Sequence, residues 1–178
     1  GATALMPVFV KDVLSAGPHA FGVLRAAPAI GAIMTSFVLS HRPIRRWAGR
    51  WMFGSVAVFG LSTILFGLSK KVEVSIAAMI LLGAADMISV YVRGTLIQIV
   101  TPDFMRGRVA SVSYLFIGAS NELGEFESGV AARFLGPVGA ALFGGIGSLV
   151  VTGVWIKLFP ALYEADRLEP PATSQRLP

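Results

Sequence analysis

Long apolar stretches separated by short polar connections set the pattern of this chain. A helix that spans the hydrocarbon core of a membrane needs about 20 mostly apolar residues. The pattern predicts a partial span at residues 1–10 and complete spans at 21–39, 51–68, 74–100, 110–134 and 139–159. A polar tail is expected at 160–178. The chain is therefore predicted to be an all-α, multi-pass membrane protein.

The first apolar run is short and begins at the first residue. It lacks the charged leader and the small-residue cleavage site of a secretory signal peptide. We interpret residues 1–10 as the end of a membrane helix whose first part lies outside this chain. The alternative is a complete protein that has been processed at its N-terminus.

The composition differs from that of an ordinary soluble domain. Of the 178 residues, 54% are hydrophobic and 14% are charged, and the mean hydropathy is +0.72. Soluble domains carry about 25% charged residues. The sequence contains no cysteine, so disulfides and thiolate chemistry within the chain are excluded.

The net charge of +5 comes mostly from the connections between the spans. The connection at 41–50 contains four arginines and no acid, and the connection at 101–109 contains Arg106 and Arg108. The connection at 69–73 has two lysines and one glutamate, and residues 136–138 carry no charge. Because basic loops stay on the cytoplasmic side, we expect the arginine-containing connections and the tail in the cytoplasm. This distribution explains the positive charge without a nucleic acid partner.

Charged and polar side chains inside two predicted spans are the candidates for function. Asp86 and Arg93 lie in 74–100, and the span 110–134 contains Asn121, Glu122, Glu125 and Glu127. A central Asp or Arg costs roughly 2.5–3.5 kcal/mol on the membrane-insertion scale, whereas each Leu, Ile, Phe or Val returns about 0.3–0.6 kcal/mol. Both spans should therefore lie in the interior of a bundle, where these groups are paired or hydrated.

Helical geometry places most of these groups on shared faces. Asp86 and Arg93 are seven residues apart, so they lie on nearly one face of their helix. In the next span one face is polar or small, and it consists of Tyr114, Gly118, Asn121, Glu125, Ser128 and Ala132. Glu127 borders the opposite, apolar face, so that either Gly124 breaks the helix or Glu127 lies near the outer interface.

Two interpretations of the intramembrane charges stay open. A carboxyl group in a poorly hydrated cavity can bind substrate or carry a proton across the membrane. Alternatively, Arg25 or Arg93 forms a buried ion pair with a glutamate and only fixes how the helices pack. The second interpretation describes a membrane scaffold or assembly subunit.

No motif in the sequence indicates an enzyme. His19 and His41 are far apart and have no acidic neighbours at ligand spacing, so we expect no metal site. The sequence contains neither a Gly-x-Ser-x-Gly nucleophile elbow nor a Walker phosphate-binding loop. We expect no cofactor.

Three segments carry a resemblance to a known family. They read RGTLIQ at 93–98, TPDFMRGRV at 101–109 and FIGASNELGEFESG at 116–129. Together they resemble the C-terminal half of a major facilitator superfamily transporter, in the branch of the enterobactin exporter and related proton-driven drug exporters. The glutamate-rich run is the most specific of the three segments.

The resemblance implies an architecture and a function. The chain would be the C-terminal six-helix half of a major facilitator bundle with its first helix truncated, and an N-terminal half would complete the cavity. The implied activity is proton-coupled efflux of a small molecule, of drug or siderophore class, by alternating access in a bacterial cytoplasmic membrane. The implied partners are membrane lipid, protons and the substrate.

The resemblance also separates two groups of candidate residues. Those expected to line the substrate and proton cavity are Asp86, Arg93, Asn121, Glu122 and Glu125. Those expected to form a cytoplasmic gating loop are Asp103, Arg106 and Arg108.

Overall fold

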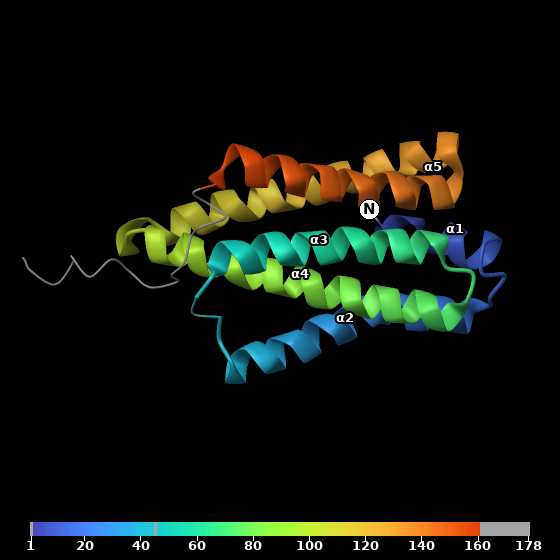
Figure 1. Cartoon of the computed structure of the whole chain (residues 1–178), viewed down its shortest axis with the longest axis horizontal. Coiled ribbons are helices and arrows are strands. Elements are labelled where there is room, and N and C mark those ends of the chain that lie inside the picture. The colour runs from blue at the N-terminus through green and yellow to red at the C-terminus, as the bar shows by residue number, and fades with distance from the viewer. Residues whose placement is uncertain (1, 45, 161–178) are drawn as a thin grey trace, which may run out of the picture.

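The computed structural model describes residues 2–44 and 46–160, and the regular elements within them are helices (Figure 1). They are α1 (Ala2–Asp12), α2 (Pro18–His41), α3 (Ala48–Leu68), α4 (Val72–Val100), the 3₁₀ turn η1 (Asp103–Met105) and α5 (Arg106–Leu158). Arg45 of the arginine-rich connection and the predicted tail after Pro160 lie outside the described residues.

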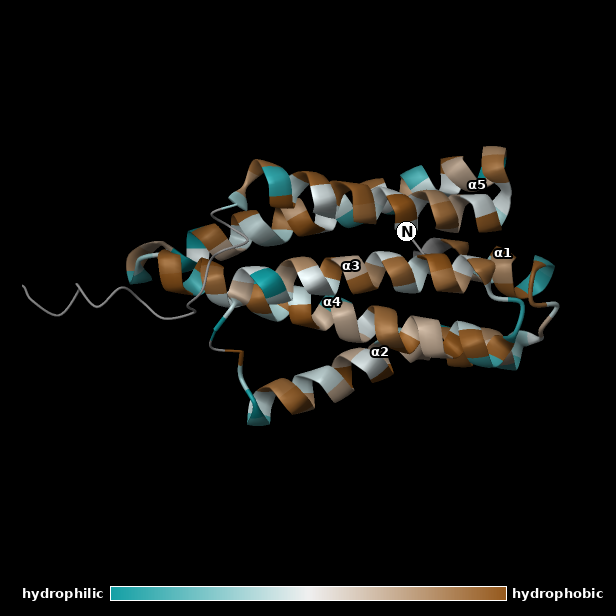
Figure 2. Cartoon of the chain, viewed as in Figure 1, coloured by the Kyte–Doolittle hydropathy of each residue, from teal (hydrophilic) through white to brown (hydrophobic). Residues whose placement is uncertain are grey.

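Four helical segments are long and apolar enough to cross a membrane. They are α2, α3 and α4, with 24, 21 and 29 residues, and the 56-residue segment Asp103–Leu158 that contains η1 and α5. Figure 2 shows that hydrophobic residues cover most of each helix and that hydrophilic ones gather toward the ends and turns. The prediction of an all-α, multi-pass membrane protein is confirmed at this level.

The helices extend a few residues beyond the apolar runs. Helix α2 begins at Pro18 instead of residue 21, since proline suits the first turn of a helix, and it ends at His41. Helix α4 begins at Val72 instead of residue 74. Hydropathy marks where a helix enters lipid, whereas the backbone hydrogen bonds of the helix continue past that point.

A sharp bend at Gly136 divides α5 into two arms, 106–135 and 137–158. Gly136 has φ 72° and ψ 171°, a conformation that is essentially restricted to glycine. Pro137 follows directly and suits the start of the second arm. The bend lies in residues 136–138, which the sequence predicts to be the connection between two spans.

Small residues let the helices approach closely at two crossings. At Gly31 and Gly83 the backbones of α2 and α4 touch, because a methyl group added to either glycine would overlap backbone atoms of the other helix. Helix α3 crosses the second arm of α5 at Gly60 and Gly145 in the same way. Close approach at small residues is the usual way in which helices pack in lipid.

The short helix α1 is inserted into the bundle. Its Phe9 is fully buried and stacks on Phe66 of α3, with ring centroids 4.3 Å apart. Leu24 of α2 and Met79 of α4 complete this core. Helix α1 therefore contributes to the interior although it has only 11 residues.

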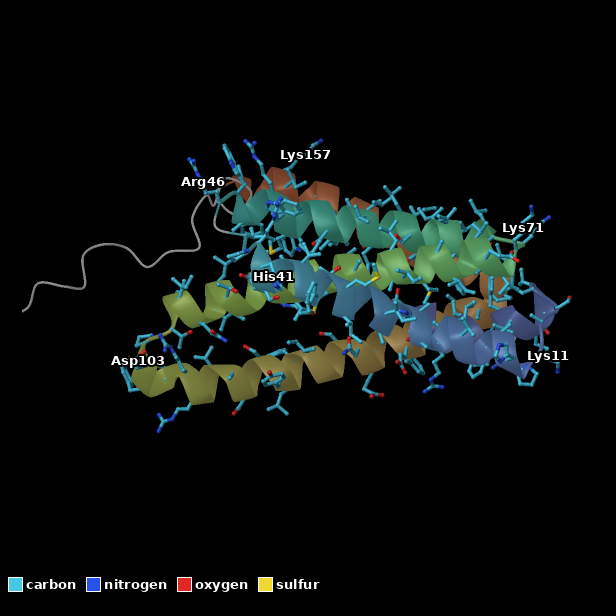
Figure 3. All side chains as sticks on the ribbon, turned by 90° about the horizontal axis from the view of Figure 1, so that it is seen from below. Lys11, His41, Arg46, Lys71, Asp103 and Lys157 are labelled. Atoms are coloured by element: carbon cyan, nitrogen blue, oxygen red, sulfur yellow. The ribbon has the colours of Figure 1, made fainter. Side chains whose placement is uncertain are left out.

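The polar connections lie at two opposite ends of the bundle. Figure 3 shows Arg46, Asp103 and Lys157 near one end, and Lys11 and Lys71 at the other. The arginine-containing connections thus share one end, as the alternation of basic loops requires.

Candidate functional site

A cavity of about 430 Å³ between the helices is lined by three of the predicted polar residues, Asp86, Asn121 and Glu125, and all three residues are exposed. All five helices contribute to its lining, which consists of Thr3, Pro28, Ala29, Ala32, Phe59, Leu82, Gly83, Asp86, Asn121 and Glu125. Two carboxylates and one amide therefore meet in a space whose remaining walls are mostly apolar or small.

Asp86 and Asn121 are close to the midpoints of their helical segments. Asp86 stands fourteen residues after Val72 and fourteen before Val100, so about 21 Å of helix extends on either side. Asn121 stands fifteen residues after Arg106, and the first arm ends fourteen residues later at Leu135. Both helices are long enough to span the hydrocarbon core of a membrane, so the two residues are at about half the length of membrane-long segments.

The crossing of α2 and α4 places Asp86 against the other helices. Gly83 is one turn before Asp86, and its missing side chain makes room for the backbone of Pro28. A proline inside a helix removes one backbone hydrogen bond and favours a kink, and Pro28 occupies such a position in α2. The crossing thus fixes the wall of the cavity opposite α5.

Arg93 lines a second cavity, of about 160 Å³, between α4 and the first arm of α5. Gln98 and Tyr114 are its other large polar residues. Asp86 and Arg93 share a helical face, but seven residues correspond to a rise of about 10.5 Å, so the two side chains line different cavities. In the described residues neither Arg93 nor Arg25 forms an ion pair with an acidic side chain.

Glu127, which is exposed, lines a third cavity, of about 390 Å³, between α1, α3 and both arms of α5. Backbone geometry departs from a helix within α5 at Gly136, so the helix continues through Gly124. Thr63, Ser128 and Ser148 supply hydroxyl groups to this cavity, and Phe59 lines both it and the Asp86 cavity. Glu122 lines none of the three cavities.

The apolar side of the first arm of α5 faces outward. Leu115, Phe116, Leu123 and Phe126 are each between 71% and 74% exposed. These side chains are suited to lipid or to a further group of membrane helices, whereas the opposite side carries Asn121 and Glu125 into the cavity.

The predicted gating residues lie on η1 and the start of α5. A terminal nitrogen of Arg106 is 2.9 Å from Oδ1 of Asp103, and the two side chains are 56% and 87% exposed. Exposed ion pairs of this kind contribute about 0–1 kcal/mol. Arg108 is also exposed. The pair therefore orders a surface turn and leaves it free to exchange partners.

Sequence reasoning did not identify Thr3, Pro28, Phe59 or Gly83 as part of the site. A proline in the middle of an apolar span and a glycine one turn before Asp86 were available as signals, whereas Thr3 and Phe59 carried none. Within residues 2–44 and 46–160 the structure contains no group of three or more His, Cys, Asp or Glu side chains that could hold a metal ion.

The chain is similar to known membrane transporters. Residues 1–176 match the family model MFS_3, described as transmembrane secretion effector. The chain is 26% identical over 164 residues to YvqJ of Bacillus subtilis (strain 168), described as an uncharacterized MFS-type transporter. This match covers 92% of the chain and 38% of the length of YvqJ. No solved structure matches the chain significantly.

Proposed function

Since the chain belongs to the MFS_3 family of major facilitator superfamily transporters, we propose that it forms the C-terminal half of a proton-coupled exporter. The exported molecule would be small, of drug or siderophore class, as in the branch that includes the enterobactin exporter. Transport would proceed by alternating access of a site near the middle of the membrane. The observation that carries this proposal is the cavity lined by Asp86, Asn121 and Glu125.

The proportions of the chain support the assignment to one half. The chain spans 38% of the length of the curated relative YvqJ. One short helix, three long helices and the two arms of α5 provide six segments, the number that a major facilitator half contains. An N-terminal half would complete the cavity beside the exposed side chains of Asn121 and Glu125. In this arrangement the chain lies in the bacterial cytoplasmic membrane with its C-terminus in the cytoplasm.

Coupling to protons requires a carboxyl group that changes its protonation during the cycle. Asp86 and Glu125 line one cavity, and bringing two negative charges together there is unfavourable. Loading a proton on either group relieves this repulsion, and binding of a substrate that interacts with the carboxylates favours its release. Arg93, Glu122 and the turn of Asp103 and Arg106 would then affect access to the site.

Neutralisation of Glu125 tests this proposal. The full-length Glu125→Gln variant is compared with wild type in everted membrane vesicles with an imposed pH gradient, using a panel of fluorescent drugs that includes ethidium. We expect a loss of gradient-driven drug transport of more than tenfold at normal abundance in the membrane. Glu73→Gln is the matched control, because Glu73 is an exposed carboxylate in the first turn of α4, far from the cavity.

The same experiment distinguishes proton coupling from the scaffold interpretation, in which the charges only fix how the helices pack. If Glu125→Gln lowers the amount of protein in the membrane and leaves transport per molecule unchanged, the carboxylate serves packing and the proposed coupling role is wrong. If the wild-type protein transports none of the drugs, the drug class is wrong. If both variants transport normally, Glu125 is not required for coupling.

A further inference from the structure

A separate cavity of about 620 Å³ lies between α3 and α4 and shares no residue with the Asp86 cavity. Its lining consists of Trp47, Arg50, Trp51, Gly54, Ser55 and Val58 on one side and Leu81, Ala84, Ala85 and Ile88 on the other. Most of these residues are apolar or small, and Trp47, Arg50 and Trp51 lie at the end where α3 begins. We refer to this space as the α3–α4 groove.

The length of the α3–α4 groove corresponds to one leaflet of a bilayer. From Trp47 to Val58 the chain advances eleven residues, which is about 16 Å of helix. The hydrocarbon core of a membrane is about 30 Å thick, so one leaflet accounts for about 15 Å. The groove thus runs from the polar connection 42–47 to about the middle of the membrane.

Cationic and aromatic groups gather at the mouth of the groove. The guanidinium group of Arg50 lies over the ring of Trp47, 4.0 Å from its centroid. Trp47 and Trp51 are 44% and 49% exposed, and indole rings favour the membrane interface. Arg46 lies at the same end of the molecule (Figure 3).

The backbone adds to the positive potential at this mouth. Trp47 is the N-cap of α3 and has φ 62° and ψ 37°, a left-handed conformation that is uncommon outside glycine. Within the part of the chain that the structure describes, no side chain caps this N-terminus with a hydrogen bond. The N-terminal end of a helix carries a partial positive charge, so an anion placed beside Arg50 interacts favourably with both the guanidinium group and the helix.

We propose that the α3–α4 groove binds a phospholipid, with an acyl chain along its apolar walls and an anionic headgroup beside Arg50. The charge at the mouth complements an anionic headgroup. Gly54, Ala84 and Ala85 leave the space that a chain of methylene groups needs. This site is independent of what the protein transports, because it lies apart from the Asp86 cavity.

Quenching of tryptophan fluorescence by brominated lipid tests the proposal directly. The full-length protein is prepared with Trp47 and Trp51 as its only tryptophans, so that Trp155 and any others are replaced by phenylalanine. Brominated phosphatidylglycerol is compared with brominated phosphatidylcholine in mixed vesicles. We expect phosphatidylglycerol to bind about fivefold more tightly, which corresponds to the approximately 1 kcal/mol that one basic residue contributes near an anionic headgroup.

Two substitutions separate the contribution of the lipid headgroup from that of the acyl chain. Arg50→Gln should remove the preference for phosphatidylglycerol while phosphatidylcholine binds as before, and Lys71→Gln at the opposite end of the bundle should change nothing. Gly54→Leu should reduce quenching by both lipids at least threefold, because a side chain there enters open space in the groove. Gly153→Leu is the control, since Gly153 also has open space and lies at a similar distance from its helix end.

Three results would refute binding of an anionic phospholipid in the α3–α4 groove. Equal quenching by the two lipids in the wild-type protein would refute the anionic headgroup. Equal effects of Arg50→Gln and Lys71→Gln would show a general effect of surface charge. If soluble glycerol phosphate competes as well as the lipid, the apolar groove contributes nothing and the assignment is wrong. Should Gly54→Leu fail to fold, the Arg50→Gln comparison still decides the question.

Discussion

Replacement of Gly83 by alanine should separate α2 from α4 and distort the Asp86 cavity. A methyl group on Gly83 would lie 2.6 Å from the carbonyl carbon and Cα of Pro28, and closer still to the carbonyl oxygen. Ordinary van der Waals contact begins at 3.4 Å, so these atoms must move by at least 3.4 − 2.6 = 0.8 Å. The contacted atoms are backbone, so no side-chain rotation can relieve the overlap.

The energetic cost follows from this geometry. Inserting a methyl group into a well-packed interior typically costs about 1–3 kcal/mol. Alanine is also the better helix former, by about 0.8–1.0 kcal/mol in water, and this gain opposes the loss. Gly94→Ala is the matched control, because Gly94 is on the same helix and has open space around its Cα. The intrinsic preference for alanine is the same in both variants, so their difference reports the overlap alone.

Thermal stability in detergent measures the effect. The full-length variants are heated in steps, and the monodisperse fraction that remains is measured by size-exclusion chromatography. We expect Gly83→Ala to lower the apparent melting temperature by several degrees relative to Gly94→Ala. Gly31→Ala should behave like Gly83→Ala, and the double substitution should cost less than the sum, because one separation of α2 and α4 accommodates both methyl groups. Equal melting temperatures for Gly83→Ala and Gly94→Ala would refute the close crossing.

Three further predictions concern α5 and the turn η1 before it. Gly145→Ala should lower thermal stability by about 1–3 kcal/mol, whereas Gly144→Ala should be tolerated, because only the first would bring a methyl group to within 2.6 Å of Ile64. Gly136→Ala should destabilise the protein by about 1–3 kcal/mol in the same heating assay, since it forces a non-glycine residue into φ 72°; an unchanged melting temperature would contradict this bend. Asp103→Asn should change stability by less than about 1 kcal/mol, so a lower transport rate in this variant would report on the gating turn and not on folding.

The sequence was sufficient to predict long apolar helices but not which of them adjoin. Apolar length alone locates each membrane helix, because the cost of burying polar groups in lipid is large and local. The neighbours of each helix depend on close crossings such as Gly83 with Pro28 and Gly60 with Gly145. Glycines at these crossings are not distinguishable in sequence from Gly94 or Gly144, which have open space around them.

In the candidate site, too, the sequence predicts the face on which a residue lies but not the residues that surround it. The helical periodicity of the sequence predicted that Asn121 and Glu125 share one face, and in the structure both line a cavity together with Asp86. Arg93 shares a helical face with Asp86, but it is two turns further along α4 and therefore lines another cavity. The environment of Glu127 depends on the second arm of α5, which folds back at Gly136 so that Ser148 lines the same cavity as Glu127. No local sequence pattern encodes that arrangement.

Accessibility of the polar face of α5 to water tests the central claim most directly. The chain contains no cysteine, so single cysteines can be introduced into this segment without prior removal of native ones. Asn121→Cys and Leu123→Cys are compared in the full-length protein for reaction with a membrane-impermeant methanethiosulfonate reagent. If a midplane cavity carries the substrate, Asn121→Cys reacts readily and Leu123→Cys does not. Reaction at Leu123→Cys with protection of Asn121→Cys would contradict the account.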